Sequence, residues 1–321
     1  MRAAQLVEPK SFKIVEVPDP KPRRGELLLK VAACGVCTGD FYAWSGNGRN
    51  YPMMAGAPGH EVCGSVVEIG ESDEGRIGIE LGQAVTAITF PGSGYAEYVV
   101  APASQVVTLP SEYRERIVLG EPLACAMNAM RRSGVLPGDS VLVIGAGFMG
   151  ILALTMLKNM GATPIVVADV LESGRAWAKK YGADVVLDPQ SQEFGSAVKE
   201  LTEGRGFDVV VEAAGVQSAL DLIADAVRIR GTVVVYGYHL GGDRSVNMQL
   251  WNWKGLTVVN GHERDNAVYA HGMQKALQML RYLRFAFDFV SHRFPLEEIN
   301  EAFSVIEERP RDYLKAAIEL T

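Results

Sequence analysis

A glycine-rich turn directly follows one of the most apolar stretches of the chain, and it limits the folds available to this sequence. The residues Val141–Ile144 are all apolar and three of the four are β-branched, as expected of a strand buried in a parallel sheet. They lead into the pattern Gly145-x-Gly147-x-x-Gly150. Such a turn opens a helix whose unpaired backbone N–H groups point at a bound anion. The stretch therefore predicts a strand, an anion-binding turn and a helix.

The residues that follow favour a nucleotide site over an ordinary turn. An apolar segment, Ile151–Met160, predicts a helix, and a second apolar strand, Ile165–Ala168, ends at Asp169, 19 residues after the last glycine. A carboxylate at this place accepts hydrogen bonds from both ribose hydroxyls of an adenosine, and it would repel a 2′-phosphate. The pattern predicts NAD, bound by Gly145, Gly147, Phe148, Met149, Gly150 and Asp169. The alternative is an ordinary βαβ unit in which the glycines serve the backbone alone.

The pattern of elements divides the chain into two domains. Residues 1–122 form short strands separated by turn signals, and strands and helices alternate from about residue 135 onward. This alternation predicts an α/β fold with a doubly wound parallel sheet over 123–260, with Leu256–Val259 as its sixth strand. Residues 261–321, with helices near 267–284 and 296–308 and a last strand near 313–320, are expected to return to the first domain.

The composition excludes several classes of function. The chain has 321 residues, a net charge of −7 and no basic run, so we expect no nucleic-acid partner. No apolar stretch is long enough to span a bilayer, and the N-terminus lacks the apolar core of a secretion signal, so we expect a cytoplasmic protein without a membrane partner. The four cysteines, Cys34, Cys37, Cys63 and Cys125, are too few for a disulfide framework.

Three short motifs in the first domain carry groups that can ligate a metal. Read alone, Cys34-x-x-Cys37 fits a redox pair or half of a structural zinc site, although no second pair is present. A catalytic zinc site is the other interpretation, since it needs three protein ligands and keeps one position open for water or substrate. The thiolate of Cys37, the imidazole of His60 and the carboxylate of Glu121 would satisfy that requirement.

Together these motifs resemble those of the zinc-containing medium-chain dehydrogenase/reductase superfamily, which includes alcohol, sorbitol and threonine dehydrogenases. The resemblance covers nearly the whole chain. It rests on Cys37-x-x-Asp40, Gly59-His60-Glu61, Glu121-Pro122-Leu123, the glycine turn and Asp169, which occur in the order and spacing of that family. It implies a GroES-like, β-rich catalytic domain joined to a Rossmann domain with a six-stranded parallel sheet.

The resemblance also assigns roles to the residues of these motifs. It implies one catalytic zinc ion held by Cys37, His60 and Glu121, with Glu61 beside the metal and able to exchange with water as a ligand. Asp40 would orient the imidazole of His60. In some polyol dehydrogenases the acid of the Glu-Pro-Leu motif holds the zinc-bound water instead.

The chain departs from the family pattern in three ways. The lobe with four closely spaced cysteines that binds a structural zinc is absent. Gly39 replaces a Ser or Thr whose hydroxyl relays the proton of the substrate in relatives, and Tyr42 stands where relatives often carry a histidine at the end of that relay. Thr38, Tyr42, a water molecule or a hydroxyl of the substrate would have to take over the relay.

The reaction implied is reversible hydride transfer between NAD and a secondary alcohol, with a polyol, cyclitol or sugar-like small molecule as substrate. Two alternatives remain, a zinc-free quinone or enoyl reductase on the same scaffold and a nucleotide-binding protein without turnover. Lys315 resembles a basic residue that contacts the pyrophosphate in relatives. By the same analogy we expect a homodimer or homotetramer. Side chains considered for lining the substrate site are Trp44, Met53, Phe90, Trp251 and Trp253.

Overall fold

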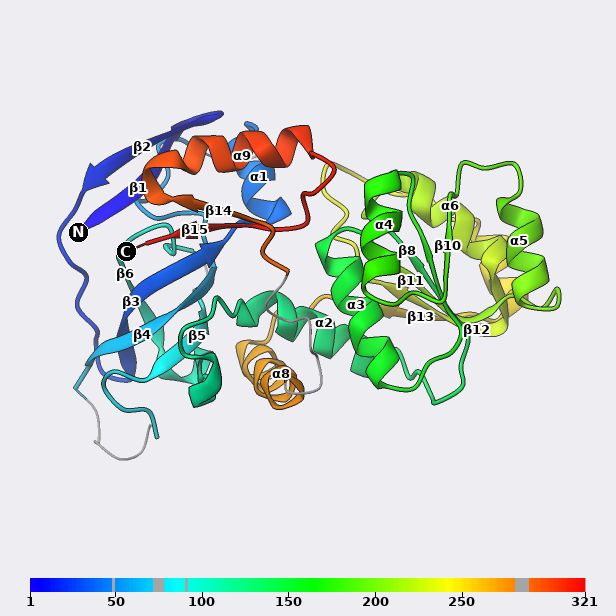
Figure 1. Cartoon of the computed structure of the whole chain (residues 1–321), viewed down its shortest axis with the longest axis horizontal. Coiled ribbons are helices and arrows are strands. Elements are labelled where there is room, and N and C mark those ends of the chain that lie inside the picture. The colour runs from blue at the N-terminus through cyan, green and yellow to red at the C-terminus, as the bar shows by residue number, and fades with distance from the viewer. Residues whose placement is uncertain (48–49, 72–77, 90–91, 281–288, 321) are drawn as a thin grey trace. The chain divides into compact units, whose positions relative to one another are not determined.

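The computed structural model describes residues 1–47, 50–71, 78–89, 92–280 and 289–320, which form two compact units. Unit 1 comprises Met1–Ala124, Arg264–Leu280 and the described residues from 289 onward, and unit 2 comprises Cys125–Glu263 (Figure 1). The junctions thus follow residues 124 and 263, where the sequence suggested 122 and 260. Each unit has its own sheet and its own hydrophobic core.

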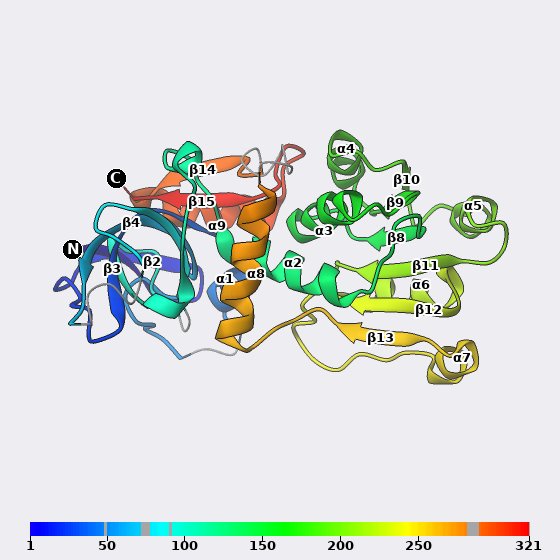
Figure 2. The same cartoon turned by 90° about the horizontal axis from the view of Figure 1, so that it is seen from below.

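Unit 2 is built on a six-stranded sheet in which every pair of neighbours is parallel. Its strands are β8 (Val141–Ile144), β9 (Ile165–Ala168), β10 (Val185–Leu187), β11 (Phe207–Glu212), β12 (Val227–Val235) and β13 (Thr257–Asn260). Their order is β10-β9-β8-β11-β12-β13, which confirms the predicted doubly wound sheet with a sixth strand. Figure 2 shows β13 at the end of this row of strands. The expected homodimer or homotetramer stays a prediction.

Helices cover both faces of this sheet, as its nearly continuous apolar strands require. The helices are α3 (Phe148–Asn159), α4 (Glu172–Lys180), α5 (Phe194–Leu201), α6 (Gln217–Ala226) and α7 (Met248–Lys254). Figure 1 shows α3 and α4 on one side of the sheet and α5 and α6 on the other. The sequence analysis did not predict α7. This helix places its two tryptophans in different environments, since Trp251 is buried in the core and Trp253 is 71% exposed.

Unit 1 contains a two-stranded sheet and a mostly antiparallel seven-stranded sheet. Its strands are β1 (Arg2–Glu8), β2 (Ser11–Glu16), β3 (Glu26–Gly35), β4 (Glu61–Ile69), β5 (Ala84–Ile88), β6 (Tyr98–Pro102), β7 (Val106–Thr108), β14 (His292–Pro295) and β15 (Ala316–Glu319). Its helices are α1 (Thr38–Trp44), α8 (Asn266–Met279) and α9 (Ile299–Glu308), and α2 (Gly120–Arg132) continues from unit 1 into unit 2. The short helices η1 (Ala103–Gln105), η2 (Ser111–Tyr113) and η3 (Leu296–Glu298) complete it.

The C-terminal strands complete the sheet of unit 1. The order β14-β15-β3-β4-β5-β7, with β6 paired to β3, places β15 directly beside β3. These two strands are antiparallel and pair Ala317 with Gly35. The last residues of the chain therefore lie beside the residues that precede Cys37, which matters for the site described below.

An aromatic cluster forms the core of unit 1 and includes a residue considered for the substrate site. The ring of Trp44 is 3% exposed and lies 5.6 Å from the ring of Phe303, which also packs against Tyr95. Met53 packs against the same core. Both side chains thus contact the core of unit 1, Trp44 from α1, and their role in the substrate site stays a prediction. Phe90, considered for the same role, lies outside the described residues.

None of the helices within the described ranges combines the length and the apolar character that crossing a membrane requires.

The three glycines of the turn after β8 are needed for different reasons. Gly145 has a φ of +104°, which side-chain-bearing residues rarely adopt. A Cβ on Gly150 would lie 1.9 Å from the carbonyl oxygen of Gly145, so α3 can approach the turn only with glycine there. A Cβ on Gly147 would meet nothing within 4 Å, which leaves the space above the turn open to a ligand.

This difference predicts unequal losses of stability for two alanine substitutions. We expect Gly150→Ala to lower the free energy of unfolding by about 3 kcal/mol, because the new methyl group collides with backbone that cannot rotate away. Gly147→Ala should cost no more than about 1 kcal/mol, the scale of placing alanine at a helix N-cap. Urea denaturation of both variants measures the difference, and equal losses would contradict this description of the turn.

Candidate metal centre

Three predicted metal-ligating residues come together because of the register of two neighbouring strands. β3 and β4 are antiparallel and pair Gly35 with Glu61. Cys37 follows the end of β3 and His60 precedes the start of β4, so both lie close to Glu61. The thiol sulfur, one imidazole nitrogen and one carboxylate oxygen of the three residues all lie within 4.8 Å of one another.

The glycine between the two cysteines of the Cys-Gly-Val-Cys motif makes room for this cluster. A Cβ on Gly35 would lie 2.1 Å from Oε2 of Glu61 and 2.6 Å from a methyl carbon of Leu119. Any larger residue at this position would displace the carboxylate. The motif therefore contributes a space as well as a ligand.

Asp40 holds the cluster together through both of its carboxylate oxygens. Oδ2 accepts hydrogen bonds from the backbone N–H of Cys37 at 3.1 Å and from the hydroxyl of Tyr95 at 2.5 Å, and Oδ1 lies 3.2 Å from Nδ1 of His60. The bond to Cys37 is part of a capping box that starts α1, in which Sγ of Cys37 accepts from the N–H of Gly39 at 3.4 Å. One buried carboxylate thus fixes two of the metal-ligating side chains.

The contacts of the imidazole ring determine which nitrogen can bind a metal. Nδ1 of His60 faces two acceptors, Oδ1 of Asp40 and the carbonyl oxygen of Pro58 at 3.1 Å, so it carries the proton. This leaves Nε2 as the nitrogen that would ligate a metal. Burial lowers the pKa of His60, but the carboxylate of Asp40 and the side chain of Cys37 together raise it more, and the pKa lies well above its ordinary value.

Tyr95 is a component of the site that the sequence analysis missed. It is fully buried, and burial together with the negative charge of Asp40 raises the pKa of its phenol well above the usual value. The phenol therefore stays protonated and donates to Asp40. Nothing in the local sequence marks this role, because Tyr95 lies 55 residues beyond its partner.

Glu61 forms a buried ion pair with Lys315. The Nζ atom of Lys315 lies 2.7 Å from both carboxylate oxygens and donates a hydrogen bond to Oε1, whereas Oε2 has no hydrogen-bond partner. Burial lowers the pKa of Lys315, but Glu61 and then Cys37 raise it above its ordinary value, so the ammonium stays charged. Lys315 was predicted to contact a pyrophosphate. Its ammonium is paired with Glu61 here, and the pyrophosphate contact stays a prediction.

The donor set fits a zinc ion. A thiolate, an imidazole and a carboxylate are the three kinds of ligand that catalytic zinc takes, and three protein ligands leave a fourth position open. Oε2 of Glu61 lies 2.7 Å from the ammonium of Lys315 but accepts no well-aligned hydrogen bond, so it keeps lone pairs that a metal could share. The residues present therefore fit the metal that the sequence motifs imply.

The other predicted site residues of unit 1 lie around this group. Glu121 is buried in the first turn of α2, outside the group of three, and its role as a ligand stays a prediction. Thr38 is exposed at the first position of α1, and Tyr42, one turn later, is half-buried. A Cβ on Gly39 would meet only Sγ of Cys37, at 3.7 Å, so a serine would fit there. The relay role of these residues is untested.

The remaining cysteines do not form the alternative sites. Cys34 and Cys37 are both free thiols, and Cys34 is fully buried, which raises the pKa of its thiol well above the usual value. Such a thiol is unreactive, which disfavours the redox pair. Cys125, on α2, is half-buried and lies outside the group of three metal-ligating residues.

Asp169 in unit 2 connects the ends of two strands. Its Oδ2 accepts a hydrogen bond from the N–H of Ala146 in the glycine turn at 2.6 Å, and its Oδ1 accepts from the N–H of Leu171 at 2.8 Å. A Cβ on Gly174 would lie 2.7 Å from the carboxylate carbon, so α4 begins close against this side chain. The carboxylate is thus fixed beside the turn expected to bind phosphates.

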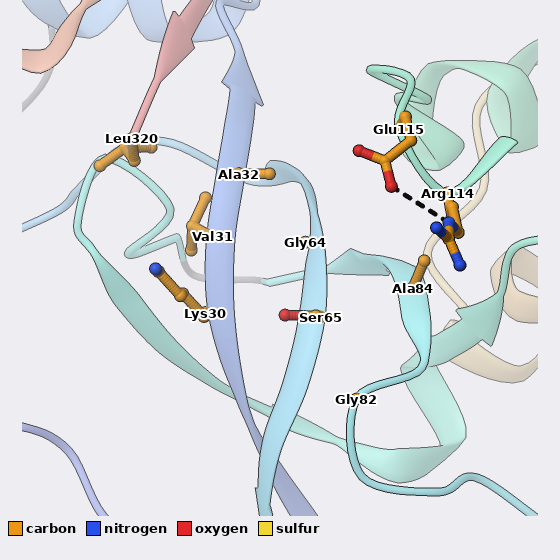
Figure 3. A pocket seen from close by; sticks show the side chains of 10 residues that line it. All are labelled: Lys30, Val31, Ala32, Gly64, Ser65, Gly82, Ala84, Arg114, Glu115 and Leu320. Atoms are coloured by element: carbon orange, nitrogen blue, oxygen red, sulfur yellow. Dashed lines mark hydrogen bonds and ion pairs between the residues drawn. The ribbon is translucent and has the colours of Figure 1, made fainter.

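A separate hollow in unit 1 contains none of the predicted site residues. Its volume is about 420 Å³, and it lies over β3 and β4 (Figure 3). Lys30 and Ser65 are on its sheet side, while Arg114 and Glu115 face it from another segment and pair with each other at 3.1 Å. Both of these charged side chains are largely exposed. The hollow lacks the donor set of the Cys37 cluster, where we place the chemistry.

The cluster predicts which cysteine retains the metal. We expect Cys37→Ser to lower zinc affinity by more than the roughly 10–100-fold seen when a residue that only orients a ligand is changed. Cys125→Ser, a half-buried cysteine outside the cluster, is the matched control and should keep about one zinc ion per chain. Metal analysis after dialysis measures both, and retention of zinc by Cys37→Ser would rule out this site.

Comparison with known proteins gives a consistent result along the chain. A family model described as an alcohol dehydrogenase GroES-like domain matches residues 23–111, and one described as a zinc-binding dehydrogenase matches residues 149–281. The L-threonine 3-dehydrogenase of Pyrococcus abyssi is 34% identical over 277 residues, covering 76% of this chain and 78% of that protein. The sorbitol dehydrogenase of Halalkalibacterium halodurans is 29% identical over 327 residues, covering 92% of each chain.

A solved structure supports the same fold. The 2R,3R-butanediol dehydrogenase of Bacillus subtilis matches with a TM-score of 0.84 and 23% identity over 99% of both chains. The expected GroES-like domain and Rossmann-type sheet are thereby confirmed. From the motifs, the fold and these matches, we conclude that the chain belongs to the zinc-containing medium-chain dehydrogenase/reductase superfamily.

Proposed function

We propose that this protein is a zinc- and NAD-dependent oxidoreductase that interconverts a secondary alcohol and its ketone, with a polyol, cyclitol or sugar-like substrate. The observation that carries the proposal is the cluster of Cys37, His60 and Glu61, whose ligand atoms lie within 4.8 Å of one another. Zinc bound there would act as a Lewis acid that lowers the pKa of a substrate hydroxyl and polarises a carbonyl in the reverse direction.

The residues around the cluster provide its orientation and its charge balance. Asp40 keeps the imidazole of His60 in one orientation and one tautomer, and Tyr95 keeps Asp40 in place. Lys315 neutralises Glu61 while the carboxylate is away from the metal, which suits the exchange of Glu61 with water or substrate that the family resemblance implies. A buried carboxylate without such a partner would be costly.

The preference for NAD rests on Asp169 and the glycine turn. The N–H groups at the start of α3 face the open space above Gly147, where a pyrophosphate would bind. Asp169, fixed at the end of β9, would accept hydrogen bonds from the adenosine ribose and repel a 2′-phosphate. Its negative charge is the part of this site that distinguishes NAD from NADP.

The substrate class follows from relatives and from the missing relay hydroxyl. Relatives described above act, by their names, on threonine, sorbitol and butanediol, each of which carries a second polar group near the reacting carbon. Gly39 offers no hydroxyl to accept the proton of the substrate. A substrate that carries its own neighbouring hydroxyl can supply that group, which favours a polyol over a simple alcohol.

The cofactor assignment predicts the effect of removing the acid of β9. We expect Asp169→Ala to raise the Kd of NADH by about tenfold or more, the equivalent of losing one charge-assisted hydrogen bond, and to affect NADPH far less. Asp169→Asn is the matched control, since it keeps hydrogen-bonding groups but removes the charge that repels a 2′-phosphate. Fluorescence titration measures these constants, and a wild-type preference for NADPH would contradict the assignment.

A substrate screen tests the reaction itself. The zinc-loaded protein is incubated with NAD and a panel of polyols, cyclitols and sugar alcohols, with simple primary alcohols as the comparison, and NADH formation is followed by absorbance. We expect turnover with at least one vicinal diol, and a rate constant lower by a factor of about 10² or more with ethanol-sized alcohols, since they lack the second hydroxyl. Undiminished turnover after complete removal of zinc would favour the zinc-free reductase.

A further inference from the structure

Unit 2 contains a hydrogen-bonded network of three side chains, built on one buried carboxylate, that the proposed chemistry does not use. Glu212, the last residue of β11, is fully buried. Its Oε2 lies 2.9 Å from Nε2 of His239, which is in the segment after β12, and Nε of Arg244 donates to Nδ1 of the same imidazole at 3.3 Å. The three side chains form a chain of hydrogen bonds that links the end of β11 to the segment after β12.

The network fixes the protonation of His239. Arginine has only donors, so Nδ1 of His239 must accept the hydrogen bond from Arg244, and Nε2 must carry the proton that it donates to Glu212. A neutral imidazole thus connects a cation to a buried carboxylate. Only one tautomer and one ring orientation satisfy both neighbours, which makes the link rigid.

The other oxygen of Glu212 shapes the turn after β11. Oε1 accepts from the N–H groups of Ala214 at 2.8 Å and Gly215 at 2.7 Å. This turn packs directly against the glycine turn of β8, because a Cβ on Gly145 would lie 2.9 Å from the nitrogen of Ala214. Glu212 therefore supports the backbone that faces the expected phosphate site.

The turn after β12 is held to Glu212 through the backbone of that residue as well as through His239. The N–H of Gly237 donates to the carbonyl oxygen of Glu212 at 2.7 Å, and a Cβ on Gly237 would lie 2.3 Å from the nitrogen of Gly215. Farther along, Arg244 donates to the carbonyl oxygen of Leu240 at 2.8 Å and so folds its own segment back toward His239. His239 is the point at which this segment is tied to β11.

The place of the cluster in the sheet indicates what it supports. β8, β11 and β12 are neighbours, and Figure 2 shows them side by side. In doubly wound sheets a dinucleotide lies across the carboxyl ends of the strands. With the adenosine at Asp169 on β9 and the pyrophosphate at the β8 turn, the other half of the cofactor extends over the turns after β11 and β12.

We propose that His239 is a positioning residue for the nicotinamide half of the cofactor. By linking Glu212 to Arg244 it holds the turns after β11 and β12 in the shape on which the nicotinamide ribose and ring rest. The inference builds on the proposed NAD-linked function, and it assigns to His239 an effect on one half of the cofactor only.

Binding of the whole cofactor and of its adenosine half separates this role from a general structural one. We expect His239→Ala to raise the Kd of NADH at least about tenfold, the factor for losing one charge-assisted hydrogen bond, while the Kd of ADP stays at the wild-type value. His239→Gln, which keeps a donor near the position of Nε2, should restore most of the NADH affinity. His271→Ala, which changes an exposed histidine on α8, is the matched control.

Each result of this titration supports or contradicts the inference. An unchanged Kd of NADH in His239→Ala, or equal losses for NADH and ADP, would overturn it. Should His239→Ala fail to fold, Arg244→Ala provides the test, because it releases the segment after β12 and leaves the bond between His239 and Glu212; loss of NADH affinity alone is again the supporting result. Failure of the wild-type protein to bind NADH would instead overturn the proposed function, and this inference with it.

Discussion

The site depends on one buried carboxylate that is shared by three donors. Asp40 accepts from the backbone of Cys37, from the phenol of Tyr95 and from the imidazole of His60, and these groups come from three segments of unit 1. The carboxylate is 1% exposed, so leaving any of its hydrogen bonds unmade would be costly. Asp40 thereby ties the backbone of Cys37 and the imidazole of His60 to one another through hydrogen bonds within the protein.

Strand register explains how distant residues reach this carboxylate. The pairing of Gly35 with Glu61 brings the end of β3 to the start of β4, and the pairing of Gly35 with Ala317 brings Lys315 to the same place. Gly35 is thus the common neighbour of both pairings, and its missing side chain leaves the space that Glu61 occupies. The buried pair of Glu61 and Lys315 then balances a charge that burial alone would disfavour.

Much of this arrangement could be predicted from the sequence, and the exceptions have identifiable causes. Cys37 and His60 lie in short motifs at strand ends, and the glycine turn with its acid has a fixed spacing, so local patterns pointed to these residues. Glu61 entered only through the family resemblance, and the local reading took Glu121 as the third ligand, whereas the structure groups Glu61 with Cys37 and His60. Tyr95 and the partner of Lys315 depend on contacts between segments far apart in the chain, which no local pattern encodes. The burial of Trp44 could not be predicted, because an aromatic residue on a short helix looks the same whether it faces a pocket or the core. Helix α7 was missed because seven residues give little periodicity.

The central claim is that one divalent cation is held by one sulfur together with nitrogen and oxygen ligands from unit 1. The X-ray absorption spectrum of the zinc-loaded protein tests this directly, because it counts the ligand types around the metal. The account predicts one sulfur at about 2.3 Å and nitrogen or oxygen neighbours at about 2.0–2.2 Å. A zinc ion surrounded by several sulfurs, or by none, would contradict it.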